Sequence, residues 1–361
     1  MTRSSPCFGK RPLNNVGVAG WRPCHRRAHS GAPLQFLLSC CLFIASFIFA
    51  QTPDYPVTVL KVPNPNDYTL FANSGWDGNW YVGYNTCWIK KLPPVPSGRY
   101  VRAYVGARLG RMKLSPAGKK PWEQQSLPGE IFMAISSTAA WTKNQYVRLT
   151  GTEDIPSEGD PESAIVTAGE SQWFWAEVPL NQVNQAGENF LALWSPTPGF
   201  LSISSSPVLA AAWGGRDIDS WVDHAVKGEP SHGPGKALAT GVSYFQPALA
   251  LKLIPAGAAH PVKVRMVSWQ NGTADHPFPI VTAAVEGDSI ERAWVEFSVD
   301  QKKWTKIDRP LWKAPFTFSL NPTSLPKTRL ALRVKAANIW EETDTSTPFL
   351  VDVSNNPETK H

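Results

Sequence analysis

The sequence predicts an all-β protein built from β-sandwiches. Short runs rich in Val, Ile, Phe, Tyr and Trp recur along its 361 residues, and 33 Pro and 26 Gly help to separate them. β-Branched and aromatic residues favour strands, whereas frequent Pro and Gly interrupt helices. The sequence contains no helical heptads, long charge tracts or clear repeats. This pattern favours stacked antiparallel sheets over a helical bundle.

The expected strands before residue 255 are short and closely spaced. They span 57–62, 67–73, 79–90, 99–109, 130–137, 171–179, 189–195, 200–204 and 242–254. The segment 216–226, RDIDSWVDHAV, is instead expected to form a short helix, because its apolar residues recur at i, i+3, i+4 and i+7.

Residues 255–261, PAGAAHP, are small, uncharged and flanked by proline, as is typical of a linker. Beyond them, apolar residues alternate cleanly in 293–299 and again in 329–336, which predicts strands with one wet face. The expected organisation has five parts. They are an export signal (1–50), a jelly-roll-like β-sandwich domain (52–255), a linker (256–261), an immunoglobulin-like β-sandwich domain (262–354) and a tail (355–361).

The N-terminal 50 residues have the pattern of an export signal. A basic segment precedes the uncharged run 36–50, FLLSCCLFIASFIFA, which is shorter than the about 20 apolar residues of a membrane span and ends in a small residue. We therefore expect export to the periplasm, the cell surface or the medium of a bacterium. A twin-arginine signal at Arg26-Arg27, a lipoprotein box ending at Cys40 and an uncleaved membrane anchor are the alternatives.

The charge of the chain gives no support to nucleic-acid binding. The net charge of +6 equals the six Lys and Arg of the first 50 residues, which contain no acid, so residues 51–361 are neutral overall. Four of the five cysteines also lie in this leader. The remaining one, Cys87, has no partner for an internal disulfide and is expected to be a small buried apolar residue.

Two segments near the C-terminus resemble a bacterial immunoglobulin-like domain. They are SIERAWVEFSVDQKKWTKIDRPLWKAPFTFSL, with its V-E-F-x-V-D strand and its A-P-F-x-F run, and LALRVKAANIWEETDTSTPFLVDV. The resemblance covers most of 262–354. It implies a module that serves as a spacer or adhesion unit in exported proteins.

Two earlier segments resemble jelly-roll domains of the galactose-binding-like, carbohydrate-binding kind. In AEVPLNQVNQAGENFLALW a strand leads through a short turn to Gly187-Glu188-Asn189 and a new strand, and RYVRAYVGARLGR is similar to an earlier strand of the same domains. The resemblance falls within 52–255. It implies a ligand-binding sandwich but transfers no site residue, because the contacts of such domains lie in variable loops.

The stretch 171–180, SQWFWAEVPL, has the features of a sugar-binding surface. Read as a strand, it places Trp173, Trp175 and Glu177 on one face and its other apolar residues, Phe174, Ala176, Val178 and Leu180, on the opposite face. Aromatic rings can stack on the apolar faces of sugars while carboxylates and amides bind the hydroxyls. A loop with Trp76, Asp77, Asn79 and Trp80 offers further rings and polar partners. The alternative is that these rings are part of the protein's own packing.

The acidic loop GTEDIPSEGDPES, 151–163, is a candidate calcium site. Its candidate ligands are Glu153, Asp154, Glu158 and Asp160. Hard cations prefer carboxylate oxygens, but the spacing is not that of an EF-hand. A solvated acidic loop that binds no metal is the alternative, and no other cofactor is expected.

Enzymatic motifs such as G-x-S-x-G and H-E-x-x-H do not occur. We therefore expect an exported, non-catalytic protein that binds a glycan or a cell-surface component. One alternative is a structural or adhesive envelope protein that binds another protein. The other is a glycosidase or polysaccharide lyase, because a catalytic carboxylate pair leaves no local signature. Contact with a membrane is expected only through an uncleaved leader.

Overall fold

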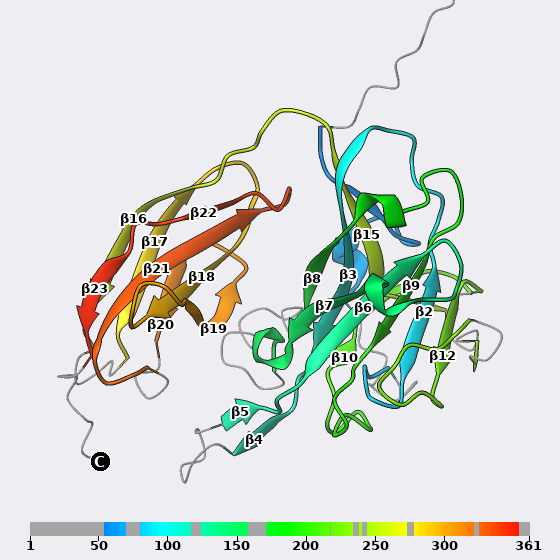
Figure 1. Cartoon of the computed structure of the whole chain (residues 1–361), viewed down its shortest axis with the longest axis horizontal. Coiled ribbons are helices and arrows are strands. Elements are labelled where there is room, and N and C mark those ends of the chain that lie inside the picture. Colours follow the sequence, from blue (N-terminus) through cyan, green and yellow to red (C-terminus); the bar gives the residue numbers. More distant parts are fainter. Residues whose placement is uncertain are drawn as a thin grey trace, which may run out of the picture. The chain divides into compact units, whose positions relative to one another are not determined.

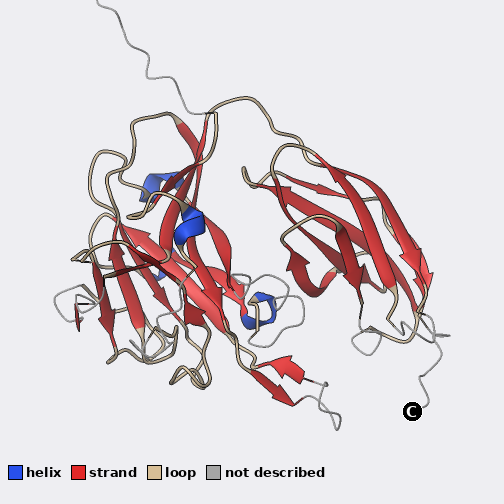
Figure 2. Cartoon of the chain, turned by 180° about the vertical axis from the view of Figure 1, so that it is seen from behind, coloured by secondary structure: helices blue, strands red, loops and turns tan. Residues whose placement is uncertain are grey.

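The computed structural model describes residues 54–69, 80–116, 124–157, 171–216, 218–233, 238–239, 244–272, 278–320 and 325–353. All of them fall in one compact unit, Phe49–His361. This part of the chain consists of antiparallel strands joined by loops and short 3-10 turns, so the predicted all-β sandwich class is confirmed (Figure 2). No helix within the described residues is long and apolar enough to cross a membrane.

The first sandwich pairs two sheets (Figure 1). The central strand of one sheet is β3 (Tyr100–Gly110), which has β8 (Ser171–Val178) on one edge and β15 (Leu249–Pro255) and β10 (Val208–Leu209) on the other. Strand β1 (Val57–Val59) pairs with the free edge of β15.

The other sheet has the order β13-β12-β2-β9-β6-β7. Its strands are β13 (Leu238–Ala239), β12 (Ser220–Asp223), β2 (Cys87–Lys91), β9 (Phe190–Trp194), β6 (Glu130–Ser136) and β7 (Tyr146–Gly151). Two small ribbons accompany the sandwich, β11 (Ala211–Trp213) with β14 (Phe245–Pro247) and β4 (Leu114–Pro116) with β5 (Gln124–Ser126). The 3-10 turns are η1 (Pro65–Asp67), η2 (Lys143–Gln145), η3 (Thr152–Asp154) and η4 (Leu180–Gln182).

The core of this sandwich forms where the inward faces of the two sheets meet. One sheet contributes small and aliphatic residues such as Val105 and Leu251, and the other contributes Trp88, Met133 and Leu193, all of them buried. The indole Nε1 of Trp88 donates a hydrogen bond of 2.9 Å to the carbonyl of Tyr81, which satisfies the one polar atom that this ring brings into the core. Cys87 is buried on the other face of its sheet, and burial raises the pKa of its thiol to about 12.

The predicted helix at 216–226 is wrong. Its central residues form β12, which pairs antiparallel with β2. Val222 contacts the sandwich core whereas Trp221 packs in a different cluster on the opposite face of the sheet, which is the two-residue period of a strand. In so short a segment the apolar pattern fits either period, and pairing with β2 decides between them.

The second sandwich pairs a three-stranded and a five-stranded antiparallel sheet. The first contains β16 (Lys263–Gln270), β17 (Ile280–Glu286) and β20 (Phe316–Ser319). The second contains β19 (Thr305–Leu311), β18 (Ile290–Ser298), β21 (Arg329–Asn338), β22 (Thr343–Thr345) and β23 (Phe349–Asp352). Val281, Val295, Leu332 and Val334 are among the residues of a separate apolar core. The strands predicted within 293–299 and 329–336 are confirmed, because β18 contains 293–298 and β21 contains 329–336. The alternation predicted for 293–299 fails at its end, where Ser298, expected on the wet face, is 1% exposed and Val299, expected on the core face, is 61% exposed.

A cluster of buried and half-buried charges joins residues of β15, β18 and the β21–β22 turn. The ammonium group of Lys252 donates a hydrogen bond of 2.6 Å to Glu341 Oε1, and both side chains are less than 8% exposed. Arg292 bonds the other carboxylate oxygen of Glu341 and also pairs with Glu291 at 2.6 Å. Two cations thus face two anions, which offsets the high cost of removing each charge from water.

The pKa values of the two acids in this cluster move in opposite directions. Burial alone would raise the pKa of Glu341, but the charges of Arg292 and Lys252 outweigh burial and hold it below its usual value. Burial is the largest influence on Glu291 and raises its pKa, although Lys252 and Arg292 oppose the shift. Glu341 is therefore the carboxylate on which the charge compensation mainly depends.

Replacing Glu341 with Gln should destabilise the protein by about 3–5 kcal/mol, because the buried Lys252 and the half-buried Arg292 both lose this partner. Because the pKa of Glu341 is lower in the folded protein than in the unfolded chain, its ionised carboxylate stabilises the fold. This stabilisation is fully present above the ordinary glutamate pKa of about 4.3, and it is lost as the pH falls through the lower pKa of the folded state. The free energy of unfolding of the variant should therefore fall less on acidification than that of the parent protein. Denaturant unfolding at several pH values measures both effects.

The matched control is Glu286→Gln, which removes an exposed pair of 2.6 Å with Arg265. Exposed pairs contribute at most about 1 kcal/mol, so this variant should unfold almost as the parent does. Equal losses in the two variants would contradict the assignment of a special role to Glu341.

Candidate functional site

The structure confirms that Trp173, Trp175 and Glu177 share the outward face of β8. The intervening Phe174 and Ala176 are buried in the core of the first sandwich. The two indoles stack on each other with centroids 5.3 Å apart and planes 13° apart, and both are half-buried, whereas Glu177 is exposed. The strand is thus aromatic on the face that points away from its core.

Trp175 lies flat across the sheet because Gly106, its partner in β3, has no side chain. A Cβ on Gly106 would come within 2.2 Å of the indole. The ring reaches the Lys252 ammonium group, which lies 4.3 Å from its centroid, and also packs against a small cluster that contains Tyr104 and Trp340. Its Nε1 is buried and has no hydrogen-bond partner among the described residues.

Trp173 is held by turn η1. Its Nε1 donates a hydrogen bond of 3.2 Å to the carbonyl of Pro65, and Tyr68 meets its ring edge-on at 5.7 Å. Arg108, opposite Trp173 on β3, reaches the same carbonyl at 3.4 Å. Both rings therefore make extensive contacts with the protein itself. Their role in binding a ligand stays a prediction.

Of the loop residues expected to accompany this strand, the structure describes Trp80. Trp76, Asp77 and Asn79 lie outside the described residues. Trp80 is buried in the core, where its ring lies 4.8 Å from that of Trp88 and 6.5 Å from that of Phe245.

The two described acidic residues of the predicted calcium site form ion pairs with basic side chains of the protein. Glu153 pairs with Arg148 at 3.3 Å, and Asp154 is bound by Lys306. Burial raises the pKa of Asp154, although Lys306 opposes the shift. Glu158 and Asp160 lie outside the described residues. Nowhere in the described ranges do three or more His, Cys, Asp or Glu side chains gather as metal ligands would.

An exposed aromatic pair that the sequence analysis missed lies on the ribbon of β11 and β14. Trp213 is 64% exposed and Tyr244 is 59% exposed, and their rings lie 6.3 Å apart with planes inclined by only 22°. Phe245, directly opposite Trp213 in the ribbon, supports the indole from its edge at 5.2 Å. Tyr244 falls within the strand predicted at 242–254, but nothing in the sequence pairs it with Trp213, whose three-residue strand β11 is too short to show an alternating pattern.

The backbone around the exposed pair is well anchored. Gly214 donates a hydrogen bond of 2.9 Å to the carbonyl of Tyr244, which ties the two aromatic segments together. The amide of the buried Gln246 donates to the carbonyl of Gly214 at 3.0 Å, and Gly215 turns the chain with a φ of +61°. Two flat rings are thus presented to solvent on a support that is already ordered.

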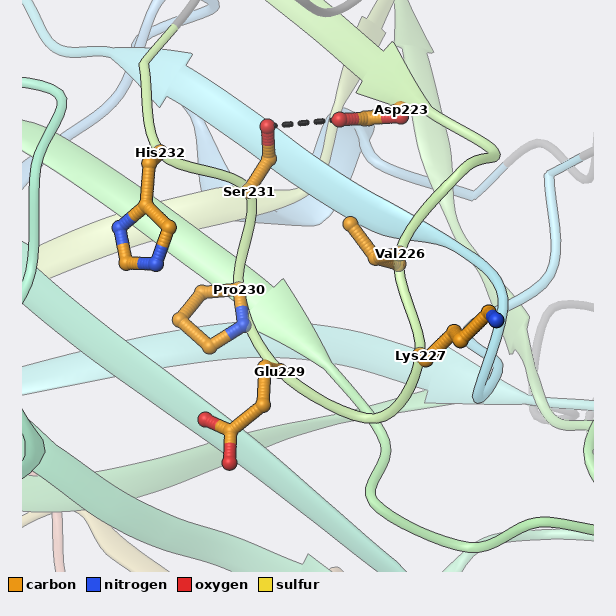
Figure 3. Close-up of a pocket in the computed structure, with 7 residues that line it drawn as sticks. All are labelled: Asp223, Val226, Lys227, Glu229, Pro230, Ser231 and His232. Carbon is orange, nitrogen blue, oxygen red and sulfur yellow. Dashed lines mark hydrogen bonds between the residues drawn. The ribbon is translucent and has the colours of Figure 1, made fainter.

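The loop that follows β12 lines a small pocket that is open to solvent (Figure 3). Its cavity of about 220 Å³ is lined by Asp223, Val226, Lys227, Glu229, Pro230, Ser231 and His232. Asp223 and Ser231 are hydrogen-bonded across the neck of this loop at 2.7 Å. The lining combines carboxylates, an ammonium group and an imidazole with two apolar side chains.

No protein-family model matches the sequence, and no curated protein shows significant similarity to it. Among solved structures, the chain is similar to the glycoside hydrolase domain of Endo-D from Streptococcus pneumoniae (11% identity, TM-score 0.23, covering 73% of this chain and 31% of that one). It is also similar to a β-1,2-glucanase from Parabacteroides distasonis (11% identity, TM-score 0.22, covering 74% of this chain and 30% of that one). A third similar structure is a β-D-glucuronidase from Dictyoglomus thermophilum (10% identity, TM-score 0.18, covering 76% of this chain and 37% of that one). The chain spans about a third of the length of each. TM-scores this low establish neither a shared fold nor a shared activity.

The contact between Trp175 and Gly106 can be tested by a double-mutant cycle. Trp175→Ala should cost at least about 2 kcal/mol of stability, because it removes a large, packed side chain. Gly106→Ala should cost about 1–3 kcal/mol, because its Cβ overlaps the indole. In the double variant the overlap with the ring is gone, so the combined loss should fall short of the sum by at least about 1 kcal/mol in denaturant unfolding.

Trp221→Ala combined with Gly106→Ala is the control, because Trp221 is also a half-buried strand tryptophan but packs in a different cluster, on the other sheet. These two losses should add. If the stability losses of Trp175→Ala and Gly106→Ala also add, or if Trp175→Ala alone costs almost no stability, the Trp175 ring does not pack on the sheet.

Proposed function

We propose that this protein is a non-catalytic, exported protein that binds a glycan. The exposed pair Trp213 and Tyr244 is the observation that carries the proposal. Large aromatic side chains that remain mostly exposed lose the free energy that burial would provide, so a pair of them on an ordered support indicates a surface that a ligand covers.

The shape of the pair favours a sugar as the ligand. Two nearly parallel rings present flat apolar faces, which complement the C–H faces of pyranose rings. Polar residues follow Trp213 closely in the sequence. Arg216 is exposed, and Asp219 makes a partly exposed ion pair of 2.6 Å with Lys61. Such groups bind hydroxyls at the edges of a stacked sugar.

We propose that the chain forms two domains, at 52–255 and 262–354, and that the second is an immunoglobulin-like spacer. Separate apolar cores in the two sandwiches support this division. The buried cluster of Lys252 and Glu341 would then hold the spacer against the binding domain. In this view the second domain sets where the binding surface is displayed and does not itself recognise the glycan.

Alanine substitutions of the exposed pair test the proposal. A glycan array and insoluble polysaccharides would first identify a ligand, and titration would give its affinity. Trp213→Ala and Tyr244→Ala should each lower this affinity by about 30-fold or more, because the loss of an aromatic anchor costs about 2 kcal/mol. Their stability should change by no more than about 0.5 kcal/mol, as is usual for surface residues.

Phe278→Ala is the control, since Phe278 is an aromatic residue 43% exposed in the second sandwich. It should bind as the parent protein does. Unchanged binding in both Trp213→Ala and Tyr244→Ala would refute the proposal. Binding to another protein through the same two rings would favour the adhesive alternative, and turnover of a polysaccharide would favour a glycosidase or lyase.

Export is tested independently by the mass of the protein recovered from cells. Cleavage after Ala50 should leave a chain that begins near Gln51, because the basic segment and the apolar run 36–50 resemble a signal that is removed. A full-length chain in the cytoplasmic fraction would be evidence against export.

A further inference from the structure

The pocket that follows β12 is formed by a closed loop. Asp223 begins the loop and Ser231 lies near its end, and the Ser231 hydroxyl donates to Asp223 Oδ2 at 2.7 Å. The other carboxylate oxygen of Asp223 accepts the N–H of Ala225 at 2.8 Å. Figure 3 shows this bond across the neck of the loop, with the remaining lining residues along its two arms. Compact loops with their ends held together are frequently functional.

Contacts outside the neck hold the loop in place. Gly228 has a φ of +73° and donates a hydrogen bond of 2.6 Å to the carbonyl of Tyr84, and a Cβ there would come within 2.5 Å of the Tyr84 ring. The Nδ1 of His224 lies 3.4 Å from the hydroxyl of Thr86. The pocket therefore exists before any ligand arrives, which lowers the entropic cost of binding.

Glu229 is oriented from the outside of the loop. Its carboxylate bonds the Tyr146 hydroxyl and lies 3.8 Å from the Lys143 ammonium group. Burial, together with this neighbouring carboxylate, raises the pKa of Tyr146 to about 12, so the hydroxyl stays protonated and continues to donate. The position of one polar wall of the pocket is thus set by the protein.

We propose that this pocket binds one neutral sugar unit. The carboxylates of Asp223 and Glu229 accept hydrogen bonds, and the ammonium group of Lys227 donates them. The two carboxylates outnumber the single ammonium group, so the lining disfavours an anionic ligand. Sugar hydroxyls both donate and accept, so a neutral polyol can satisfy groups of both kinds, while Val226 and Pro230 face its C–H groups.

The size of the pocket suits a single sugar unit, and its open side leaves room for the rest of a chain to extend into solvent. Its volume of about 220 Å³ lies below the about 300–1,000 Å³ that is usual for drug-sized ligands. This inference rests on the proposed function only in assuming that the ligand is a sugar. The pocket would hold the end of a chain whose other sugars stack elsewhere, and it shares no residue with Trp213 and Tyr244.

Titration of the full chain with the methyl glycosides of glucose, galactose, mannose and N-acetylglucosamine, followed by ligand-detected NMR, tests this inference. At least one should bind saturably. Glu229→Gln and Lys227→Met should each weaken that binding at least tenfold without unfolding the protein, since both side chains are exposed. Glu188→Gln is the control, because Glu188 is 58% exposed and pairs with Lys91 away from the pocket.

Trp213→Ala separates this inference from the proposed function. It should weaken binding of the polysaccharide and leave binding of the methyl glycoside unchanged. The inference is overturned if none of the four glycosides binds, or if Glu229→Gln and Lys227→Met bind as the parent does. It is also overturned if Trp213→Ala abolishes binding of the methyl glycoside, because the monosaccharide would then be held by the aromatic pair.

Discussion

A buried ammonium group is the constraint on which much of this structure depends. Lys252 lies on the outward face of β15, where its side chain is only 4% exposed. A charge in that position is tolerated only with close partners of opposite sign, and Glu341, from the turn between β21 and β22, is the main one. Arg292 and Glu291 extend the compensation. The charge thus links residues almost 90 positions apart in the chain.

The same constraint explains the two tryptophans of SQWFWAEVPL. The electron-rich face of Trp175 lies against the Lys252 ammonium group, so the ring both shields the charge from water and stabilises it. Gly106 makes room for the indole to lie flat, and Trp173 stacks beside it. The first sandwich is therefore packed on both faces of this sheet, with apolar residues inside and tryptophans and charged residues outside.

This arrangement separates two kinds of aromatic residue. Trp173 and Trp175 occur in a long, regular strand, and the protein itself contacts their rings. Trp213 ends one strand of a ribbon of three-residue strands and Tyr244 immediately precedes the other, and their rings remain mostly exposed. Binding surfaces are commonly carried by short, irregular segments on a rigid scaffold, because such segments are not needed to complete the core. The pocket loop at Asp223–Ser231 follows the same rule.

The sequence by itself determined the all-β class, most of the longer strands and the inward and outward faces of β8, since a two-residue period over eight residues needs no tertiary information. It misassigned β12 as a helix, because four paired residues are too few to distinguish the two periods. Only the tertiary structure decided which rings are covered and which are exposed. Solvent exposure depends on residues far away in the chain, such as Glu341, which contacts Lys252, and Pro65, which contacts Trp173. The local sequence pattern contains no information about such contacts.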